Sequence, residues 1–456
     1  MTTAWWCEHL WAGAVEHDVL VTAEHGRITR VEPGTPRPVG IPVLRGLVVP
    51  GLANAHSHAF HRLLRSRAQT GRGTFWTWRE LMYDVARRLD PDTYRELATA
   101  VYAEMALAGV TGVGEFHYLH HDRDGARYAE PNAMGLALAD AARAAGIRLT
   151  LLDTCYLASD VDGAPLRPEQ LRFGDGSGDA WASRVDALHA RLSGVDGVLV
   201  GAALHSVRAV PPEHTAAVTG WAAAHEAPLH VHVAEQVDEV RRCRAVHGRT
   251  PVGLLHDTGV LGPRTTAVHA THLTEADIEL VRATGTGVCF CPTTERDLGD
   301  GVGPAPELLA EPPVACCLGS DSHAVIDLLA EARALELDQR LHRRQRGLFD
   351  AATLLGCAAD HRALGRPDAG RIAPGARADL VAIDLGTVRT AGGGPAAETA
   401  VFAASAADVT DVVVDGRVVV RDGRHLGVPD AAGRLAAITA ELLDSCPRAA
   451  GLPERP

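Results

Sequence analysis

The sequence predicts an α/β protein built around a (β/α)8 TIM barrel, with short strands at both ends of the chain. From residue 49 to about 365, strand-like and helix-like segments alternate, which is typical of a parallel sheet covered by helices. Histidines or an acid follow several apolar runs there, and such barrels present their functional side chains at the carboxyl ends of strands. A chain of 456 residues accommodates a barrel of about 250 residues or more together with a small β-domain.

The part of the chain before the barrel, from about residue 10 to 48, is predicted to form short strands. Asp18–Thr22 and Arg27–Val31 are rich in apolar and β-branched residues and flank a turn at His25-Gly26. Prolines at positions 33, 36 and 38 then separate these strands from the barrel.

Segments of the barrel and of the C-terminal part can be assigned by their periodicity. Helices are expected at Tyr94–Ala108 and Met134–Ala145, and strands at Gly112–Glu115, Ile147–Leu152 and Val198–Leu204. Short strands return from residue 366 to about 425. A final helix is expected at Ala431–Leu443, followed by a polar, proline-bearing tail that is expected to be disordered.

The most informative motif lies at residues 50–58, where an apolar run leads into two histidines separated by one residue. In a strand, residues i and i+2 point to the same face, so His56 and His58 can aim two imidazoles at one point. That arrangement suits a divalent metal, although two ordinary polar histidines would give the same pattern.

Three later segments supply further groups of the same kinds. Each is an apolar, strand-like run that ends in a histidine or a carboxylate: Leu229–Glu235, Ala267–His272 and Cys316–His323. If these strands belong to one barrel, their imidazoles and carboxylates converge at its carboxyl end and form a site for a borderline metal.

This constellation resembles the amidohydrolase superfamily. In that family the first barrel strand supplies His-x-His, the fifth a His, the sixth a further His and the eighth an Asp. The resemblance implies metal ligation by His56, His58, His232 and Asp321, and catalytic roles for Glu235, His269 and Asp321.

The resemblance extends to both ends of the chain. Gly370–Val381 is similar to the family's return into its small β-domain, and Val412–Val420 is similar to the closing hairpin of that domain. The resemblance therefore implies a distorted barrel over residues 49–365 and a composite β-sandwich domain over residues 1–48 and 366–456, which includes the C-terminal helix.

The chain contains no lysine, and all 44 of its basic residues are arginines. A Schiff-base lysine is therefore excluded, and so is the bridging carboxylated lysine of dinuclear amidohydrolases. The resemblance then favours a single divalent metal per chain, with Zn²⁺ as the expected ion, as in the deaminase branch. Zinc, iron and manganese all occupy such sites, so the sequence leaves the native metal open.

The candidate residues allow a hydrolytic reaction. A zinc ion held by three histidines and an aspartate keeps a position for water and lowers the pKa of that water toward neutrality. Asp321 could then accept the water proton, and His269 could stabilise the tetrahedral intermediate. Glu235 follows His232 by three residues and could carry a proton to a leaving nitrogen, although an acid at the start of a helix would look the same.

Three further segments indicate an anionic substrate. Phe75–Tyr83 is aromatic, and Glu115–Asp122 and Leu204–Val210 follow strand-like runs. Arginine offers a planar fork that matches a carboxylate, so Arg79 and Arg208 suit carboxylate binding. Surface salt bridges are the alternative for these arginines, and a second metal site is the alternative for the histidines between 117 and 121.

Together with Leu298–Gly301, these segments narrow the resemblance to the formimidoylglutamate deiminases of histidine degradation. Those enzymes hydrolyse N-formimidoyl-L-glutamate to N-formyl-L-glutamate and ammonia. The resemblance implies that the two substrate carboxylates are held by Arg79, Tyr118, His205 and Arg208.

The sequence departs from that family at two places. His61 stands where the family is expected to have glutamine, and Thr293–Asp297, which includes Arg296, differs from the family's run. Either change could alter substrate preference, so His61 is included among the candidate substrate-binding residues.

Composition limits the partners and the compartment. The net charge of −13 argues against nucleic acid as a partner, because phosphate binding needs a basic surface. The nine cysteines form no C-x-x-C pair and indicate buried thiols in a reducing cytosol. The N-terminus lacks the basic region of a signal peptide, and no apolar run approaches the roughly 20 residues that span a bilayer. We therefore expect a cytoplasmic protein that binds a small anionic substrate, and the resemblance implies a homodimer.

Several alternatives remain at this point. A Gly-x-Ser-x-Gly elbow and the Pro-Cys-x-x-Cys signature of other zinc deaminases are both absent from the sequence. An aminohydrolase of the same superfamily acting on an amino-heterocycle such as a purine or pterin would share the metal ligands. So would a hydrolase that releases an amine or acid, or a non-catalytic metal-binding relative.

Overall fold

The computed structural model describes residues 2–69 and 73–443. Its centre is a parallel sheet of eight strands, which lie side by side in chain order from β5 to β12. The strands are β5 (Leu52–Ser57), β6 (Val110–His117), β7 (Arg148–Cys155), β8 (Val198–Ser206), β9 (Leu229–Val233), β10 (Thr265–His269), β11 (Gly287–Phe290) and β12 (Cys316–Leu318). A parallel bridge between Ser57 and Asp321 joins the first strand to the segment after the last and nearly closes the barrel.

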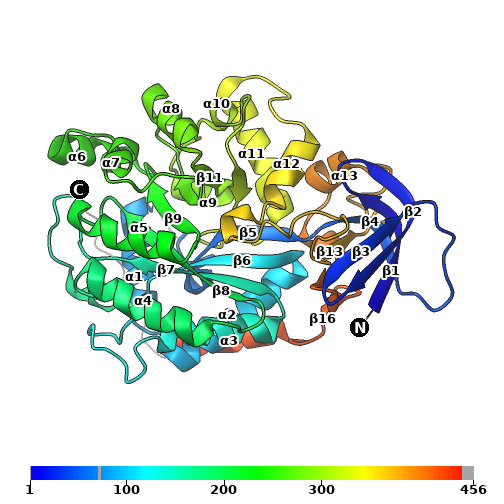
Figure 1. The fold of residues 1–456 in the computed structure, drawn as a ribbon, viewed down its shortest axis with the longest axis horizontal. Helices are drawn as coiled ribbons and strands as arrows, with labels where there is room; N and C mark the ends of the chain where they lie inside the picture. Colours follow the sequence, from blue (N-terminus) through cyan, green and yellow to red (C-terminus); the bar gives the residue numbers. More distant parts are fainter. Residues whose placement is uncertain (1, 70–72, 444–456) are drawn as a thin grey trace.

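Helices connect the strands and cover the outside of the barrel (Figure 1). The longer ones are α1 (Phe75–Ala86), α2 (Pro91–Leu107), α3 (Ala133–Ala145), α4 (Gly178–Leu192), α5 (Thr215–Ala224), α6 (Val237–His247), α8 (Glu275–Thr284), α11 (Leu328–Arg343) and α12 (Ala351–Ala358). Shorter helical elements include η1 (Ala59–Leu64), η2 (Pro168–Phe173), α7 (Pro251–Asp257), α9 (Pro292–Leu298), α10 (Ala305–Leu308) and α13 (Ala397–Phe402).

Local sequence explains where helix α2 begins and which face it buries. Asp90 accepts a hydrogen bond from the backbone N–H of Thr93, whose side chain bonds back to Asp90, and Pro91 occupies the first helical position. Leu97, Val101 and Met105 follow at intervals of four and are buried against the barrel.

The second sheet contains strands from both ends of the chain, in the order β16-β15-β14-β13-β4-β1-β2-β3. Figure 1 shows it beside the barrel, with its N-terminal strands in blue. Its strands are β1 (Thr2–Trp11), β2 (Val15–Glu24), β3 (Arg27–Glu32), β4 (Val43–Pro50), β13 (Leu380–Ile383), β14 (Val409–Val414), β15 (Arg417–Arg421) and β16 (Arg424–His425). This sheet fits the small β-domain expected from the two chain ends.

Gly51 joins the second sheet to the barrel, because it alone separates β4 from β5. A Cβ at this position would lie 2.3 Å from Oγ1 of Thr111 and 2.7 Å from Cβ of Asp379. The two sheets approach each other so closely here that no side chain fits, which explains the glycine immediately before the His-x-His strand.

The expected elements agree with the structure within a few residues. The helix at Ala431–Leu443 is α14, and it packs beside α2, where Nη1 of its Arg434 lies 3.0 Å from Oε1 of Glu96. Strand β1 was not expected, since the sequence analysis placed the first strands after residue 10. The predicted disordered tail lies outside the described residues. No helix in the described part of the chain has both the length and the apolarity needed to cross a bilayer.

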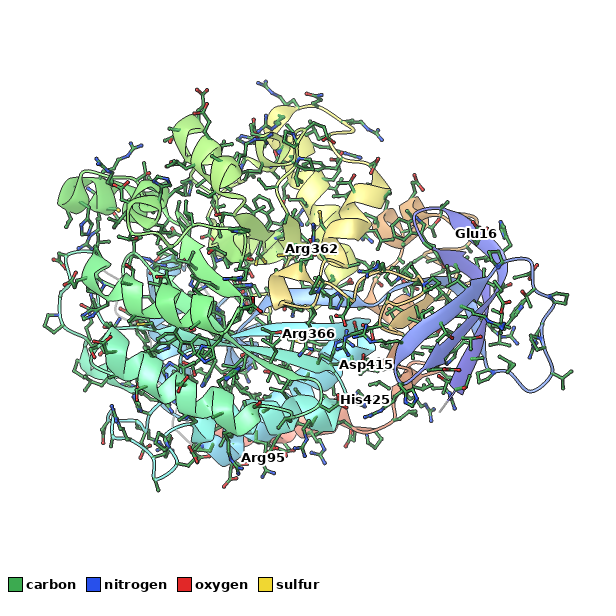
Figure 2. The ribbon with its side chains drawn as sticks, viewed as in Figure 1. Glu16, Arg95, Arg362, Arg366, Asp415 and His425 are labelled. Atoms are coloured by element: carbon green, nitrogen blue, oxygen red, sulfur yellow. The ribbon has the colours of Figure 1, made fainter. Side chains whose placement is uncertain are left out.

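A buried ion pair ties the barrel to the second sheet. Arg148, at the start of β7, and Asp379, just before β13, each expose only 1% of their side chains. Nη1 of Arg148 lies 2.9 Å from Oδ1 of Asp379 and 3.1 Å from Oδ1 of Asp415, and its Nη2 contacts Oδ2 of Asp379. Asp415 and Arg366 mark this boundary in Figure 2. The backbone N–H of Asp415 also donates to Asp379 at 2.9 Å, but Arg148 supplies the positive charge that compensates this buried carboxylate.

We predict that Arg148→Ala destabilises the protein by about 3–5 kcal/mol, because it leaves the Asp379 carboxylate buried and unpaired. Urea unfolding followed by circular dichroism measures the effect. The matched control is Arg417→Ala. Arg417 pairs with Asp196, but the two side chains are 79% and 82% exposed. This substitution should therefore leave the free energy of unfolding unchanged. Equal midpoints for the two variants would contradict the assigned role.

Candidate metal centre and adjoining cavity

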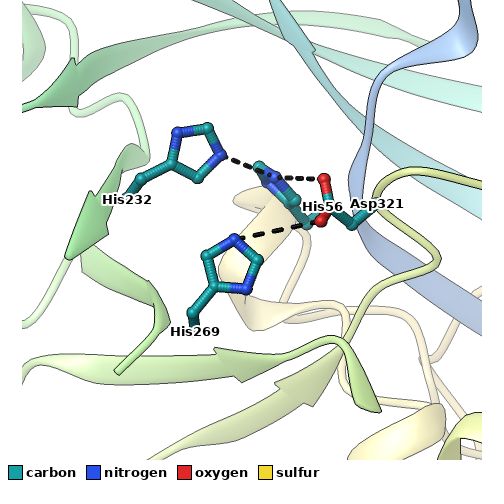
Figure 3. A group of neighbouring side chains, drawn as sticks. All are labelled: His56, His232, His269 and Asp321. Atoms are coloured by element: carbon teal, nitrogen blue, oxygen red, sulfur yellow. Dashed lines mark hydrogen bonds and ion pairs between the residues drawn. The ribbon is translucent and has the colours of Figure 1, made fainter. Parts of the chain in front are cut away.

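Five side chains named in the sequence analysis come together at the carboxyl end of the barrel. His56 lies in β5 and His58 just after it, His232 lies in β9, His269 ends β10, and Asp321 follows β12. Each of these residues is at most 6% exposed. Figure 3 shows His56, His232 and His269 directed toward the Asp321 carboxylate from three different strands. The barrel thus converts positions far apart in the sequence into one buried cluster.

The atoms of the cluster are close enough to share a single ion. Oδ1 of Asp321 lies 3.3 Å from Nε2 of His56 and 3.3 Å from Nε2 of His58. Nε2 of His232 lies 3.0 Å from Nε2 of His56. One ligand atom each from His56, His232, His269 and Asp321 falls within 4.8 Å of the others, and so does one each from His58, His61 and Asp321.

Hydrogen bonding and burial leave these groups in forms that can bind a metal. The Phe116 carbonyl can only accept, so Nδ1 of His58 donates to it at 2.8 Å and its Nε2 offers a lone pair to the cluster. Burial lowers the pKa of His56 to about 3, although Asp321 opposes this shift, and burial likewise lowers the pKa of His232. Both imidazoles are therefore neutral, which is the ligating form.

Asp321 is held as a carboxylate. Burial alone would raise its pKa, but the contacts with His56 and His58 outweigh burial and hold the pKa well below its usual range. A buried carboxylate beside the neutral imidazoles of His56 and His232 is a donor set that fits a borderline divalent cation such as zinc.

Strained backbone conformations gather around the cluster. Among residues other than glycine, positive φ angles occur at Ala234 (54°), His269 (69°), Ala270 (48°), Asp321 (40°) and His323 (58°). All five lie at or just after the ends of β9, β10 and β12. Such conformations cost about 1–3 kcal/mol each and persist where the surroundings enforce them, which is common at functional sites. Two of the five, His269 and Asp321, belong to the cluster itself.

His269 stands between carboxylates on both sides. Its Nδ1 lies 3.5 Å from Oε1 of Glu295, and its Nε2 lies 3.9 Å from Oδ2 of Asp321. Burial alone would lower the pKa of His269, but Glu295, Glu235 and Asp321 raise it to about 10. Glu295 has no role expected from the sequence, because nothing in its segment signals that the side chain is buried beside a histidine.

A cavity of about 550 Å³, counted with its opening to solvent, adjoins the cluster. Aromatic side chains form much of its wall, from Phe75, Trp78, Tyr83, Tyr118, Tyr156 and Phe173. All five residues expected to bind substrate line it as well: His61, Arg79, Tyr118, His205 and Arg208. The cavity also includes Glu235, His269 and Asp321, so the candidate substrate-binding and catalytic groups share one space.

Neighbouring side chains fix the polar groups of the cavity. Nε2 of His61 lies 3.0 Å from the Tyr118 hydroxyl, and His205 packs on Tyr156 with ring centroids 4.4 Å apart. Nη2 of Arg208 lies 3.1 Å from Oε2 of Glu235. The guanidinium proposed to bind substrate is thus already in contact with the proposed proton carrier.

One further histidine of strand β9 and two charged residues of the Thr293–Asp297 segment lie elsewhere. Nε2 of His230 contacts the carbonyl oxygen of Ala363 at 2.8 Å, so His230 does not face the cluster. Arg296 pairs with Asp338 and Asp297 accepts hydrogen bonds from Gln69, and neither Arg296 nor Asp297 lines the cavity.

An arginine already pairs with the carboxylate that a metal ion would need in the alternative second metal site at residues 117–121. His117, His120 and Asp153 do lie within 4.8 Å of one another. However, Nη1 and Nη2 of Arg184 donate to both oxygens of Asp153 at 2.9 and 2.8 Å, and the guanidinium already supplies the compensating charge. We interpret this cluster as a structural network.

Comparison with known proteins identifies relatives over nearly the whole chain. Residues 47–419 match the Amidohydrolase family. The chain is 40% identical to a formimidoylglutamate deiminase of Pseudomonas aeruginosa over 88% of this chain and 90% of that protein. It is 31% identical to an 8-oxoguanine deaminase of the same species over 91% of this chain and 94% of that protein.

Solved structures show the same fold. An amidohydrolase from Brucella melitensis superimposes with a TM-score of 0.89 at 34% identity and covers 97% of this chain and 100% of its own. An adenosine deaminase from Xanthomonas campestris with bound zinc superimposes with a TM-score of 0.83 at 24% identity, over 97% of this chain and 98% of its own.

We predict that the zinc-reconstituted protein binds about one metal per chain. His232→Ala should weaken metal affinity at least about 100-fold, because loss of a group that merely hydrogen-bonds to a ligand already lowers affinity by about 10–100-fold. Metal content after dialysis, measured by mass spectrometry, tests this. His230→Gln is the matched control, because His230 lies in the same strand but faces Ala363. Equal metal retention in the two variants would rule out His232 as a ligand.

Proposed function

The chain belongs to the amidohydrolase family, and we propose that it hydrolyses N-formimidoyl-L-glutamate to N-formyl-L-glutamate and ammonia. The main support for this proposal is the cavity, because Arg79 and Arg208 line it together with residues of the candidate metal centre. A substrate with two carboxylates and one small amidine needs both features. The 40% identity to a formimidoylglutamate deiminase over 88% of the chain supports the same reaction.

The residues that would hold the metal are His56, His58, His232 and Asp321, with zinc as the proposed ion. When bound, such a metal supplies Lewis-acid activation of water at neutral pH. Asp321 would accept the proton of the attacking water, because it remains a carboxylate despite its burial. His269 would donate a hydrogen bond to the tetrahedral intermediate that forms when water adds to the amidine carbon. Glu235, in the same cavity, would deliver a proton to the leaving nitrogen.

The substrate carboxylates would be held at the aromatic side of the cavity. Arg79, in helix α1, and Arg208, just after β8, offer planar guanidinium groups that can bind a carboxylate through two N–H donors. The Tyr118 hydroxyl and the His205 ring would add neutral donors. We further propose a role in histidine degradation, a cytoplasmic location and a homodimer, and light scattering tests the last of these.

The direct test is ammonia release from N-formimidoyl-L-glutamate by the zinc-loaded protein, with N-formylglutamate identified by mass. Stoichiometric ammonia and formylglutamate would establish the reaction and the substrate together. Release of ammonia only from purines or pterins would overturn the substrate and favour the amino-heterocycle alternative, which the 31% identity to an 8-oxoguanine deaminase motivates.

We predict that Asp321→Asn and His269→Asn each lower kcat by at least about 100-fold while the protein stays folded. His269→Asn should retain its metal, because His269 acts on the substrate. Parallel measurements of ammonia release, metal content and circular dichroism separate the two effects. Activity near that of the unchanged protein in both variants would refute the assigned roles, and metal loss in His269→Asn would make His269 a ligand instead.

We predict that His61→Gln changes kcat/KM for N-formimidoyl-L-glutamate by less than about tenfold. A glutamine amide can replace the 3.0 Å contact between His61 and the Tyr118 hydroxyl. Even complete loss of a neutral hydrogen bond would cost only about 1 kcal/mol. Steady-state kinetics on this substrate and on amidines of different chain length check it. A change of more than about 100-fold, or a switch of the preferred substrate, would show that His61 determines specificity.

A further inference from the structure

Arg208 is shared by two carboxylates in the structure. Its Nη2 lies 3.1 Å from Oε2 of Glu235, and its Nε lies 3.2 Å from Oε2 of Glu239. The three side chains are 14%, 8% and 0% exposed, so these contacts are shielded from water. Screening is therefore weak, and the charges on these three groups influence each other strongly.

The two carboxylates are held very differently. Oε1 of Glu239 accepts a hydrogen bond of 3.1 Å from the backbone N–H of Ala234, and this side chain is fully buried. Glu235 instead lines the cavity that adjoins the candidate metal centre. Arg208 lines this cavity and also a second, outer cavity, whose lining includes Arg79, Glu239 and Arg242. Glu239 is thus a fixed anchor for the guanidinium, whereas Glu235 faces the space that substrate must enter.

From this geometry, and resting on the proposed function, we propose that the substrate carboxylate displaces Glu235 from Arg208. A guanidinium offers five N–H donors in a fixed fork, and the anchor Glu239 lies on its Nε side as an ion-pair partner at 3.2 Å. An incoming carboxylate that binds both Nη atoms would compete with the Glu235 oxygen for Nη2, which Glu235 contacts at 3.1 Å. Glu235 is then released toward the cavity, where it can reach the leaving nitrogen.

This exchange makes carboxylate recognition part of turnover. A ligand that lacks the carboxylate leaves Glu235 paired with Arg208, so it loses catalytic rate as well as affinity. The enzyme would thereby discriminate against small neutral amidines that fit the cavity. The role of Glu239 is positional, since it keeps Arg208 in place while the second carboxylate is exchanged.

Glutarate binding tests the exchange without any chemical step, because glutarate carries two carboxylates and no amidine. We expect the zinc-loaded Glu235→Gln variant to bind glutarate at least about fivefold more tightly than the unchanged protein, since glutarate no longer competes with Glu235 for Arg208. Isothermal calorimetry measures the affinities. Glu235→Ala, which removes the polar group entirely, should show the same direction and guards against misfolding of one variant.

Two controls isolate Arg208 as the point of competition. Asp238→Asn removes a nearby negative charge that pairs with Arg241, and it should change glutarate affinity by less than about twofold. In an Arg208→Lys background, which keeps the charge but loses the fork, the gain from Glu235→Gln should disappear. Unchanged or weaker glutarate binding in both Glu235 variants, or an equal gain in Asp238→Asn, would overturn the exchange.

The result is separable from that of the proposed function. If formimidoylglutamate is hydrolysed but glutarate binding does not respond to Glu235, the function stands and the exchange fails. If glutarate binds more tightly to the Glu235 variants but formimidoylglutamate is not hydrolysed, the exchange stands for another dicarboxylate substrate.

Discussion

The buried Asp321 carboxylate is the constraint on which the rest of the structure depends. Its backbone N–H donates to the carbonyl oxygen of His56 at 3.0 Å, and its own carbonyl accepts from His58 at 3.4 Å. The same residue therefore closes the barrel seam and gathers the histidines, at the cost of a positive φ of 40°. A buried anion must be compensated or neutralised. The imidazoles of His56 and His58 lie 3.3 Å from this carboxylate, so the residue that closes the barrel seam is also the residue on which the candidate metal centre is built.

Because the chain contains no lysine, guanidinium groups pair with several buried carboxylates outside the histidine cluster. Arg148, Arg184 and Arg208 are largely buried, and each contacts two carboxylates at once. A planar guanidinium can satisfy two acids in different directions, whereas an ammonium group is a point charge that is more strongly hydrated. Arg148 applies this property between the two sheets and Arg208 applies it inside the cavity. The same chemistry joins the two sheets in the first place and lines the candidate site in the second.

The sequence allowed prediction of the barrel, the strand-end histidines and the cavity residues, because apolar periodicity and the family resemblance both depend on local residue order. It did not reveal β1, whose parallel partner β4 lies some forty residues later, nor the strained backbone at His269, which no glycine signals. Glu239 belongs to a polar run that looks like an exposed helix start, yet its side chain is fully buried. Contacts of this kind arise only from tertiary packing, so a single sequence does not contain their signal.

The two histidine clusters show which physical feature separates a metal centre from a structural network. Both combine histidines with one aspartate at the carboxyl end of barrel strands. At Asp153, the oxygens accept hydrogen bonds from Arg184 and from Nε1 of Trp181 at 3.0 Å, so its charge and lone pairs are already engaged. At Asp321, the ion pairs in the described part of the chain involve histidines alone. Ligand types and spacing are therefore not enough to identify a metal centre. The deciding observation is whether an arginine of the protein already forms an ion pair with the carboxylate.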